Sequence, residues 1–466
     1  MNSKGLQKIF NPRSVAIVGA TTKTSKVGYV VLKNLLDSGY EGKIYPINPK
    51  YEEVLGLKCY KSVLEIKQKI DCVLIAVPAE AVPQVIKECG EKKVGGIVVL
   101  SGGFEEVGRQ DLAAQIKEYA KTYDLPIIGP NCLGIYNPYS KIDSIFFPFY
   151  KMNRPKPGGI SFVTQSGALG SVMLDLAAAY NIGVSKFISY GNATVLNESD
   201  LLEFLGNDKK TKTIILYIEG VKDGRRLFNV MKRINKKKPI IVLKAGKEEK
   251  GKKAAMSHTG NLAGNYLAYK AAFRQAKVVE AKDVDELFNL MRIFSQPLAK
   301  GKRVGVITNG GGLGVLITDA VEKEKLELVE FTKENEQELR AIIPSYANPR
   351  NPLDMAADAS VEMYQKAIEY YLKNNNIDLI VVAILFQTPT LDERLINVIG
   401  EAVEQKKKPI VVVTIGGDYT EAYRKIMESK GIVTFSSPNA AVKTLRKFVE
   451  YSYYIRCQIN HLCEFY

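Results

Sequence analysis

The sequence predicts an α/β protein made of three consecutive doubly wound domains with mainly parallel sheets. Two observations support this fold class. Short β-branched apolar runs alternate with helical stretches along the whole chain, and two connectors rich in Pro, Gly and Lys interrupt the alternation. Such alternation is typical of βαβ units on a parallel sheet. At 466 residues the chain has room for about three domains of ordinary size.

The first predicted domain covers residues 1–150 and is expected to be Rossmann-like. Its strand-like runs are Ser14–Val18, Lys43–Ile47, Cys72–Val77, Gly96–Leu100 and Pro126–Ile128. Turns of Gly, Pro and polar residues follow these runs, and ligands of open α/β sheets bind at such carboxyl ends. We therefore expect a ligand site along this edge.

The second and third predicted domains cover residues 151–298 and 299–466, and both are expected to be flavodoxin-like. The connectors that precede them are residues 151–159 and 296–302. The strand-like runs are Ile160–Val163, Val184–Ile188, Thr213–Tyr217 and Pro239–Leu243 in the second domain, and the third begins with Arg303–Ile307.

An internal repeat links these two domains. Ile160–Gly170 aligns without gaps on Val304–Gly314, and Lys236–Leu243 resembles Lys406–Val413. The repeated piece is a strand, a tight polar or glycine turn and a helix start. Backbone N–H groups and the positive end of the helix dipole then lie at the carboxyl edge of the sheet. Each copy therefore predicts an anion site.

Composition indicates a protein that handles small anions. The net charge is +15, lysines are spread along the chain, and Trp is absent, which disfavours an aromatic and basic surface for nucleic acid. We expect phosphorylated small molecules as ligands. No apolar run reaches about 18 residues, and the N-terminal residues lack an apolar signal core, so we expect a cytoplasmic protein without a membrane span.

The cysteines predict reduced thiols and no structural metal. They show no Cys-x-x-Cys spacing, and several lie beside strand-like runs, where a thiol packs as a small apolar group. Cys457, His461 and Cys463 leave a metal site in the tail as an alternative, although a fourth ligand is missing. The six cysteines are Cys59, Cys72, Cys89, Cys132, Cys457 and Cys463.

The first strand–turn–helix, Ile17–Gly28, is a looser version of the dinucleotide motif Gly-x-Gly-x-x-Gly. The second strand is followed by Lys50 rather than by an acidic residue for a ribose, which favours a ligand with extra phosphate. Coenzyme A fits this pattern better than NAD does. Two alternatives stay open: the ligand is NADP, or Lys50 is only a solvated turn residue. The candidate cofactor-binding residues are Gly19, Ser25, Lys26, Val27, Gly28, Lys50, Val77, Pro78, Ser101, Gly102 and Asn131.

His258 is one of two histidines in the chain, the other being His461. It follows a run rich in Gly and Lys, Lys244–Lys253, whose composition predicts a mobile loop. Within this run, Gly246–Lys253 nearly matches a P-loop but lacks the final Ser or Thr that would bind magnesium. We therefore interpret the run as a flexible arm that carries His258.

These motifs together resemble the α subunits of ADP-forming acetyl-CoA synthetase, in the nucleoside-diphosphate-forming acyl-CoA synthetase superfamily. The resemblance extends over about residues 8 to 450. The motifs that carry it are Gly19 to Gly28, Asn48–Lys50, Val77–Ala79, Gly129–Asn131, Gln165–Gly167, Ile218–Gly220, Ser257–Gly260, Asn309–Leu313 and Asn351–Asp354.

The resemblance implies a ligase reaction in which acyl-CoA, phosphate and ADP become acid, CoA and ATP through an acyl phosphate and a phosphohistidine. His258 would carry the phosphoryl group, and Glu219 would orient its ring. Both repeated helix starts would face one phosphohistidine. The phosphate-binding residues implied are Gln165, Ser166, Gly167, Asn309, Gly310, Gly311 and Gly312.

The resemblance also implies a partner. An ATP-grasp β subunit would bind ADP or ATP with Mg²⁺, in an α2β2 heterotetramer. The turn Thr21–Lys26 departs from the shorter version in succinyl-CoA synthetases, and residues 451–466 match no family motif. Two other functions stay open: a non-catalytic CoA-binding regulatory subunit of a protein acylation system, and an NADP-dependent oxidoreductase. The sequence does not indicate which acyl group is used.

Overall fold

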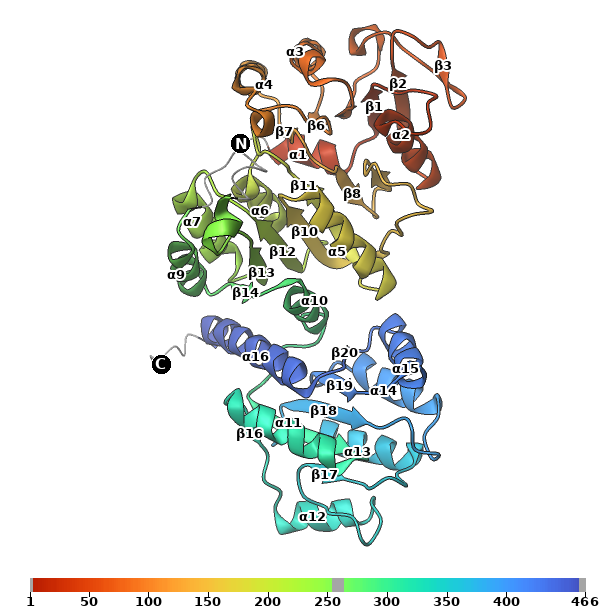
Figure 1. Cartoon of the computed structure of the whole chain (residues 1–466), viewed down its shortest axis with the longest axis vertical. Helices are drawn as coiled ribbons and strands as arrows, with labels where there is room; N and C mark the ends of the chain where they lie inside the picture. Colours follow the sequence, from red (N-terminus) through yellow and green to blue (C-terminus); the bar gives the residue numbers. More distant parts are fainter. Residues whose placement is uncertain (1–2, 254–263, 461–466) are drawn as a thin grey trace. The chain divides into compact units, whose positions relative to one another are not determined.

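The computed structural model describes residues 3–253 and 264–460 of the chain (Figure 1). The chain divides into two compact units, Met1–Ala281 and Lys282–Tyr466. Helices alternate with strands in both units, and most strand pairs are parallel. The predicted fold class is therefore confirmed.

The first sheet has the strand order β2-β1-β5-β6-β7, and all its pairs are parallel. Its strands are β1 (Ser14–Val18), β2 (Lys43–Ile47), β5 (Cys72–Ile75), β6 (Gly96–Val99) and β7 (Ile127–Ile128), with a separate hairpin of β3 (Glu53–Val54) and β4 (Leu57–Lys58). The helices of this region are α1 (Ser3–Phe10), α2 (Val27–Asp37), α3 (Val82–Glu91) and α4 (Gln110–Thr122), and the 3-10 turns are η1 (Val63–Glu65), η2 (Ala79–Ala81) and η3 (Glu105–Val107).

The second sheet has the order β14-β13-β12-β10-β11-β8-β9. Its strands are β8 (Ile135–Asn137), β9 (Ile142–Asp143), β10 (Pro157–Thr164), β11 (Val184–Ser189), β12 (Thr213–Ile218), β13 (Ile240–Lys244) and β14 (Val279–Ala281). The helices α5 (Gly167–Ala179), α6 (Glu198–Asn207), α7 (Gly224–Ile234) and α9 (Tyr266–Ala276) connect them. The antiparallel strands β8 and β9, which precede the connector at residues 151–159, extend the second sheet.

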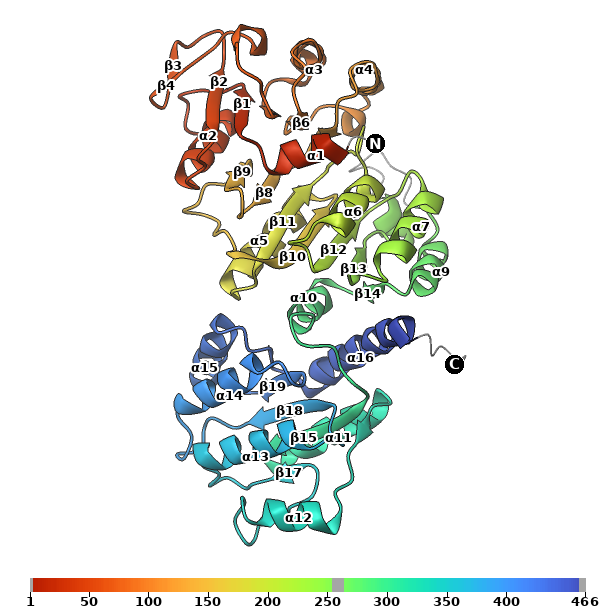
Figure 2. The same ribbon diagram turned by 180° about the vertical axis from the view of Figure 1, so that it is seen from behind.

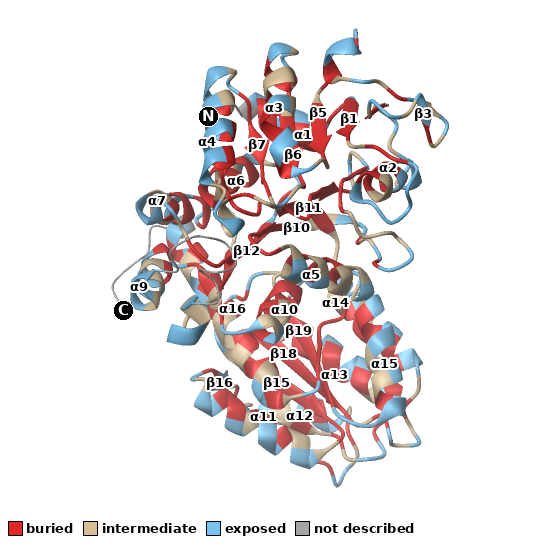
Figure 3. Ribbon diagram, turned by 45° about the horizontal axis from the view of Figure 1, so that its top comes forward, coloured by how far each residue is buried: buried red, intermediate tan, exposed pale blue. Residues whose placement is uncertain are grey.

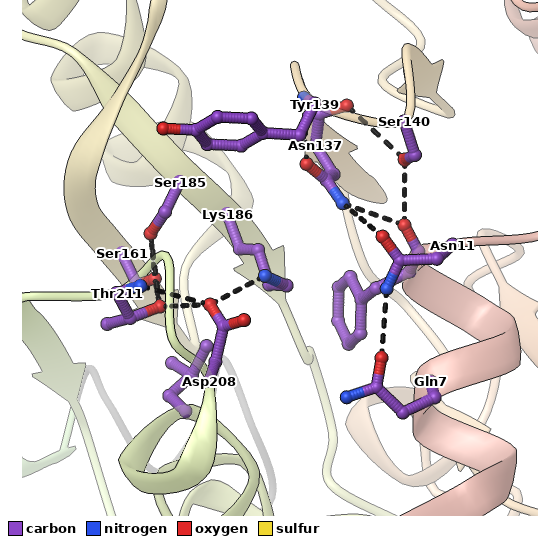
Figure 4. A network of polar contacts seen from close by, with 12 residues as sticks. Gln7, Asn11, Asn137, Tyr139, Ser140, Ser161, Ser185, Lys186, Asp208 and Thr211 are labelled. Carbon is purple, nitrogen blue, oxygen red and sulfur yellow. Dashed lines mark hydrogen bonds and ion pairs between the residues drawn. The ribbon is translucent and has the colours of Figure 1, made fainter.

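Figure 4 shows two groups of polar contacts in this unit, one that links α1 to β8 of the second sheet and one within the part of the chain that forms the second sheet. Asn137 on β8 donates a hydrogen bond from Nδ2 to the carbonyl of Phe10 on α1 at 2.8 Å. The Phe10 ring stacks on Phe204 of α6 at 5.1 Å between centroids. In the second group, Asp208, which follows α6, accepts from Lys186 of β11 at 2.6 Å and from the hydroxyl of Thr211 at 2.6 Å.

The second unit contains one further sheet, with the order β16-β15-β18-β19-β20 and with β17 beside β15. Figure 2 labels β15, β17, β18 and β19 of this sheet. Its strands are β15 (Arg303–Thr308), β16 (Glu327–Leu328), β17 (Leu353–Asp354), β18 (Leu379–Ile384), β19 (Ile410–Thr414) and β20 (Thr434–Phe435). Its helices are α10 (Val284–Ile293), α11 (Gly311–Lys323), α12 (Lys333–Arg340), α13 (Val361–Lys373), α14 (Arg394–Glu404), α15 (Asp418–Ser429) and α16 (Pro438–Asn460).

The strands are the most buried part of each unit (Figure 3). Continuous apolar runs such as Ile240–Leu243 and Leu379–Ile384 are buried at every position, as expected for strands of a parallel sheet that is covered on both faces. None of the helices within the described parts of the chain combines the length and the apolar character needed to cross a membrane.

The sequence repeat is also a repeat of contacts. Lys238, before β13, donates from Nζ to the carbonyls of Leu205 (2.7 Å) and Asp208 (2.5 Å) at the end of α6. Lys408, before β19, donates in the same way to Tyr371 (2.7 Å) and Asn374 (2.5 Å) at the end of α13. A cation at the C-terminal end of a helix is favourable because the last carbonyls there lack intrahelical donors. The two Lys-Lys-Lys-Pro runs therefore have the same structural role.

Candidate functional site

The turn between β1 and α2 brings several predicted cofactor-binding residues together. Gly19 has a φ of 95°, and a Cβ on Gly28 would lie 2.0 Å from the carbonyl oxygen of Gly19, so both positions require glycine. Ser25, Lys26 and Val27 are exposed at the start of α2. The first N–H groups of a helix have no intrahelical acceptor and favour anions. The turn can therefore hold a phosphate.

The loop after β2 is tied to this turn. The side chain of Asn48 donates to the carbonyl of Ala20 at 2.8 Å, and the hydroxyls of Thr21 and Tyr51 lie 3.1 Å apart. Lys50 is exposed on the same loop. An exposed ammonium beside a helix N-terminus suits a ligand with more than one phosphate.

The remaining predicted cofactor-binding residues meet at the ends of β5, β6 and β7. Ser101 donates from its hydroxyl to the carbonyl of Val77 at 2.6 Å, and the N–H of Asn131 donates to the carbonyl of Ser101 at 2.8 Å. A Cβ on Gly102 would lie 3.1 Å from Oδ1 of Asn131. Pro78 is exposed beside Val77. The structure therefore collects these residues at one edge of the first sheet.

Glu106 and Asn192 join this edge to the second sheet and were not among the predicted residues. Glu106 accepts from the N–H of Gly103 at 2.6 Å and from Asn192 at 2.5 Å. Burial raises the pKa of Glu106, but these hydrogen bonds outweigh burial and lower it below its usual value. Asn131 donates to Asn192 at 3.3 Å. The sequence feature that could have identified Asn192 is the pair Gly191-Asn192, which follows a strand-like run.

Glu219 lies at the carboxyl edge of the second sheet, next to the start of α5. It is 6% exposed. Gln165 accepts at Oε1 from the backbone N–H groups of Glu219 (2.7 Å) and Gly220 (3.2 Å). Burial raises the pKa of Tyr217, so its hydroxyl stays protonated and donates to Oε1 of Glu219 at 3.3 Å. A buried, oriented carboxylate thus lies on an edge that the sequence predicted for anions.

The start of α5 is formed by predicted phosphate-binding residues. Ser166 is the N-cap, and its hydroxyl accepts from the N–H of Leu169 at 3.2 Å. Gln165 is 4% exposed, and among the described residues its Nε2 has no hydrogen-bond partner. Buried polar groups are normally paired, so an unpaired donor at this edge is consistent with a ligand oxygen. Gly167 follows as the first residue of α5.

In the second unit, the corresponding turn contains the other predicted phosphate-binding residues. Asn309 accepts at Oδ1 from the N–H of Leu385 at 2.8 Å and from Tyr364 at 3.0 Å. Gly310 precedes α11, and Gly311 and Gly312 are exposed at its start. The Asn309 side chain therefore fixes the backbone that follows β18. The backbone of the glycines remains available to an anion.

Two further observations concern the segment that carries the predicted nucleophile. His258 lies outside the described residues, as do His461 and Cys463. The prediction of a loop over Lys244–Lys253 is wrong at Lys244, which ends β13, and over residues 249–253, which are helical. Local composition misled here, because pairing with β12 and side-chain burial stabilise Lys244 in a strand.

Lys244 is the main site residue that the sequence analysis missed. Its side chain is 1% exposed and donates from Nζ to the carbonyl of Glu219 at 2.7 Å. Burial lowers the pKa of Lys244 to about 8. A lysine at the end of an apolar strand carries no recognisable motif, so only its contact with Glu219 identifies it.

The described residues contain no group of three or more His, Cys, Asp or Glu side chains arranged to hold a metal ion. Cys457 is buried on α16. The five cysteines Cys59, Cys72, Cys89, Cys132 and Cys457 are free thiols.

Three family models match successive parts of the chain. They are a CoA binding domain over residues 13–138, a succinyl-CoA ligase like flavodoxin domain over residues 157–294, and a Ligase-CoA domain over residues 304–447.

Similar proteins cover nearly the whole chain. It is 41% identical over 442 residues to the α subunit of Pyrococcus furiosus acetate–CoA ligase [ADP-forming] II, covering 93% of this chain and 95% of that subunit. It is 43% identical over 452 residues to Methanocaldococcus jannaschii acetate–CoA ligase [ADP-forming], covering 96% of this chain and 63% of that protein. The structure of Ca. Korarchaeum cryptofilum dinucleotide forming acetyl-coenzyme A synthetase 1, in complex with phosphate and ADP, matches with a TM-score of 0.91, 33% identity and 99% coverage of both chains.

Proposed function

This chain belongs to the family of ADP-forming acetate–CoA ligases, and from that membership we propose that it is the α subunit of an ADP-forming acyl-CoA synthetase. The proposed reaction converts acyl-CoA, phosphate and ADP into the free acid, CoA and ATP. The observation that carries the proposal is the pairing of Gln165 with Glu219, which holds a buried carboxylate beside the start of α5.

CoA is the proposed ligand of the first sheet. The exposed start of α2 and the neighbouring Lys50 suit the phosphates of CoA, because both offer positive charge at one edge. The match of residues 13–138 to a CoA binding domain supports this assignment. The turns around Val77, Ser101 and Asn131 would line the rest of the site.

The proposed chemistry passes through two intermediates. An oxygen of phosphate bonds to the acyl carbon, the carbon–sulfur bond breaks, and the CoA thiolate takes up the proton that phosphate releases. A ring nitrogen of His258 then bonds to phosphorus, and the acyl carboxylate leaves. An oxygen of ADP finally bonds to phosphorus and frees the imidazole. A neutral imidazole is nucleophilic near physiological pH, which suits this exchange.

Glu219 and the helix starts have separate proposed roles. The carboxylate of Glu219 would accept a hydrogen bond from the second ring nitrogen of His258 and so fix the reacting tautomer. The start of α5, with Gln165, Ser166 and Gly167, would bind the phosphoryl oxygens. The backbone of residues 309–312 is proposed for the same purpose.

A nucleotide-binding β subunit is the proposed partner. The Pyrococcus furiosus relative is named an α subunit, and the chain spans 63% of the longer Methanocaldococcus jannaschii relative. We propose that an ATP-grasp β subunit binds ADP and Mg²⁺ in an α2β2 assembly. We also propose a cytoplasmic location for the assembly.

Labelled phosphate tests the proposal directly. Incubation with acetyl-CoA and radiolabelled phosphate is expected to leave an acid-labile, base-stable label on the chain, and His258→Asn is expected to remove it. Label retained in that variant would overturn the assignment. Binding of CoA without any label would favour the regulatory alternative, and a nicotinamide-dependent absorbance change would favour the oxidoreductase.

The subunit assignment needs a second measurement. ATP formation from acetyl-CoA, phosphate and ADP is expected only after an ATP-grasp partner is added. ATP formed by this chain alone would contradict the proposal that a separate β subunit binds the nucleotide.

A further inference from the structure

The ammonium group of Lys244 connects three segments that are separate in sequence. Its Nζ donates to the carbonyl of Glu219, after β12, at 2.7 Å and to the carbonyl of Ala245, after β13. It also lies 4.8 Å from the ring centroid of Tyr269 on α9, within the range of a cation–π contact. Ala245 and Tyr269 lie on either side of His258 in sequence. One buried cation therefore joins both flanks of that segment to the strand end that carries Glu219.

The internal repeat shows that the fold does not require this arrangement. In the second sheet Lys244 pairs in register with Ile218, and in the sheet of the second unit Thr414 pairs with Ile384. Thr414 therefore occupies the position of Lys244, and its hydroxyl donates to the carbonyl of Ile384 at 2.9 Å. In the second copy, a small neutral side chain is therefore sufficient to link the ends of the two neighbouring strands by a hydrogen bond.

Two other pairs of matching positions show which side chains both copies of the repeat share and which occur in the first copy alone. An amide accepts from the N–H after the neighbouring strand in both copies: Gln165 from Glu219 at 2.7 Å, and Asn309 from Leu385 at 2.8 Å. The residue that follows the strand is a carboxylate in the first copy and a leucine in the second. Carboxylate and lysine therefore occur together in the first copy, and both are missing from the matching positions of the second.

We propose that Lys244 is a positioning residue for Glu219 in phosphoryl transfer, an inference that rests on the proposed function. Gln165 holds the N–H of Glu219, Lys244 holds its carbonyl, and the hydroxyl of Tyr217 holds its carboxylate. With all three groups held, the carboxylate has little freedom to turn away from the edge of the sheet. Misplacement of a catalytic group by about 1 Å can cost about 10²-fold in rate.

The charges around Lys244 decide when it acts as a cation. Burial lowers its pKa to about 8, the carboxylate of Glu219 opposes that shift, and the ammonium groups of Lys247 and Lys252 add to it. Tyr269 faces it from α9 with a ring rather than a charge. Lys244 is therefore mainly protonated below about pH 8 and loses its positive charge above it.

The first test uses a substitution taken from the second copy of the repeat. Lys244→Thr is expected to slow labelling of His258 by about 10- to 100-fold, with the affinity for CoA unchanged. The matched control is Thr414→Val, which removes the corresponding hydrogen bond from the second unit and is expected to label at the wild-type rate. Labelling of Lys244→Thr at the wild-type rate would overturn the proposal.

The second test separates charge from packing. Wild-type labelling is expected to decline above about pH 8, where Lys244 loses its charge. The guanidinium of Lys244→Arg stays protonated, so this variant is expected to recover part of the labelling rate and to show no such decline. An identical decline in wild type and Lys244→Arg would contradict a role for the charge of Lys244.

A third measurement distinguishes this proposal from the proposed function. Hydrogen exchange of the Glu219 and Gly220 amides is expected to be faster in Lys244→Thr than in wild type and unchanged in Thr414→Val, whether or not the protein is an enzyme. Absence of label on the wild-type chain would count against the proposed function alone. Unchanged exchange in Lys244→Thr would count against the positioning role alone.

Discussion

Gln165 and Glu219, 54 residues apart, are joined by a hydrogen bond of 2.7 Å from the N–H of Glu219 to Oε1 of Gln165. The same oxygen accepts from Gly220 at 3.2 Å. In the second unit, Asn309 accepts from the N–H of Leu385 at 2.8 Å. An amide at the end of the first strand of each repeat thus fixes the backbone that follows its neighbour, and in the first copy that backbone carries the proposed catalytic carboxylate.

Gln165→Leu is expected to lower the free energy of unfolding by about 1–3 kcal/mol, because two buried N–H groups lose their acceptor. Urea titration measures this change. Asn309→Leu is the matched variant in the second unit and is expected to have a similar effect on stability. Gln165→Leu is also expected to slow labelling of His258, because the backbone that carries the Glu219 carboxylate loses the amide that holds it. Labelling of Gln165→Leu at the wild-type rate, at a temperature where the variant is folded, would contradict this role.

Glu219→Gln preserves the shape of the side chain and removes its charge. Since the carboxylate is proposed to orient the imidazole of His258, labelling is expected to slow by about 10²- to 10⁴-fold. The affinity for CoA, measured by calorimetry, is expected to stay unchanged because the proposed CoA site lies on the first sheet. Rapid-quench labelling at the wild-type rate would remove Glu219 from the mechanism.

Gly28→Ala is expected to weaken CoA binding and to destabilise the first unit. The added Cβ would lie 2.0 Å from the carbonyl oxygen of Gly19, so the turn between β1 and α2 has to shift. Overpacking of this kind costs about 1–3 kcal/mol. Gly224→Ala, at the start of α7, is the control, because its Cβ would meet nothing within 4 Å. Thermal unfolding and a CoA titration of both variants provide the comparison.

Glu198 is expected to make the first unit less stable as the pH rises. Burial raises the pKa of this carboxyl to about 7 from an ordinary value of 4.5. The folded state therefore holds the proton more tightly than the unfolded state. The resulting stability is fully present below pH 4.5 and is lost as the pH rises through about 7, a change of about 3 kcal/mol.

The variant Glu198→Gln tests this assignment, because its neutral amide cannot titrate. Urea unfolding between pH 4.5 and pH 8 is expected to show a flatter dependence on pH than wild type, with the variant more stable above pH 7. Parallel curves for the two proteins would show that Glu198 does not cause the change.

Much of the fold could be predicted because its signals are local. A run such as Cys72–Val77 reads as a strand from its own residues, and it contains β5. The similarity of Lys236–Leu243 to Lys406–Val413 predicted a structural repeat, and the structure bears this out because Lys238 and Lys408 make equivalent contacts with the end of a helix. The domain boundaries near residues 150 and 298 stay predictions. β8 and β9 pair within the second sheet, and α10 belongs to the second compact unit.

The sequence by itself determined the fold class and the turns that can hold anions, because parallel βαβ units bring the loops after their strands to one edge of the sheet. It could not determine which side chains meet there. Gln165, Glu219 and Lys244 come from β10, β12 and β13 or the turns after them, and they meet because these strands are neighbours in the sheet. Only the tertiary structure decided that Lys244 belongs to a buried strand end, since its burial and its contact with Glu219 depend on strand order rather than on local composition.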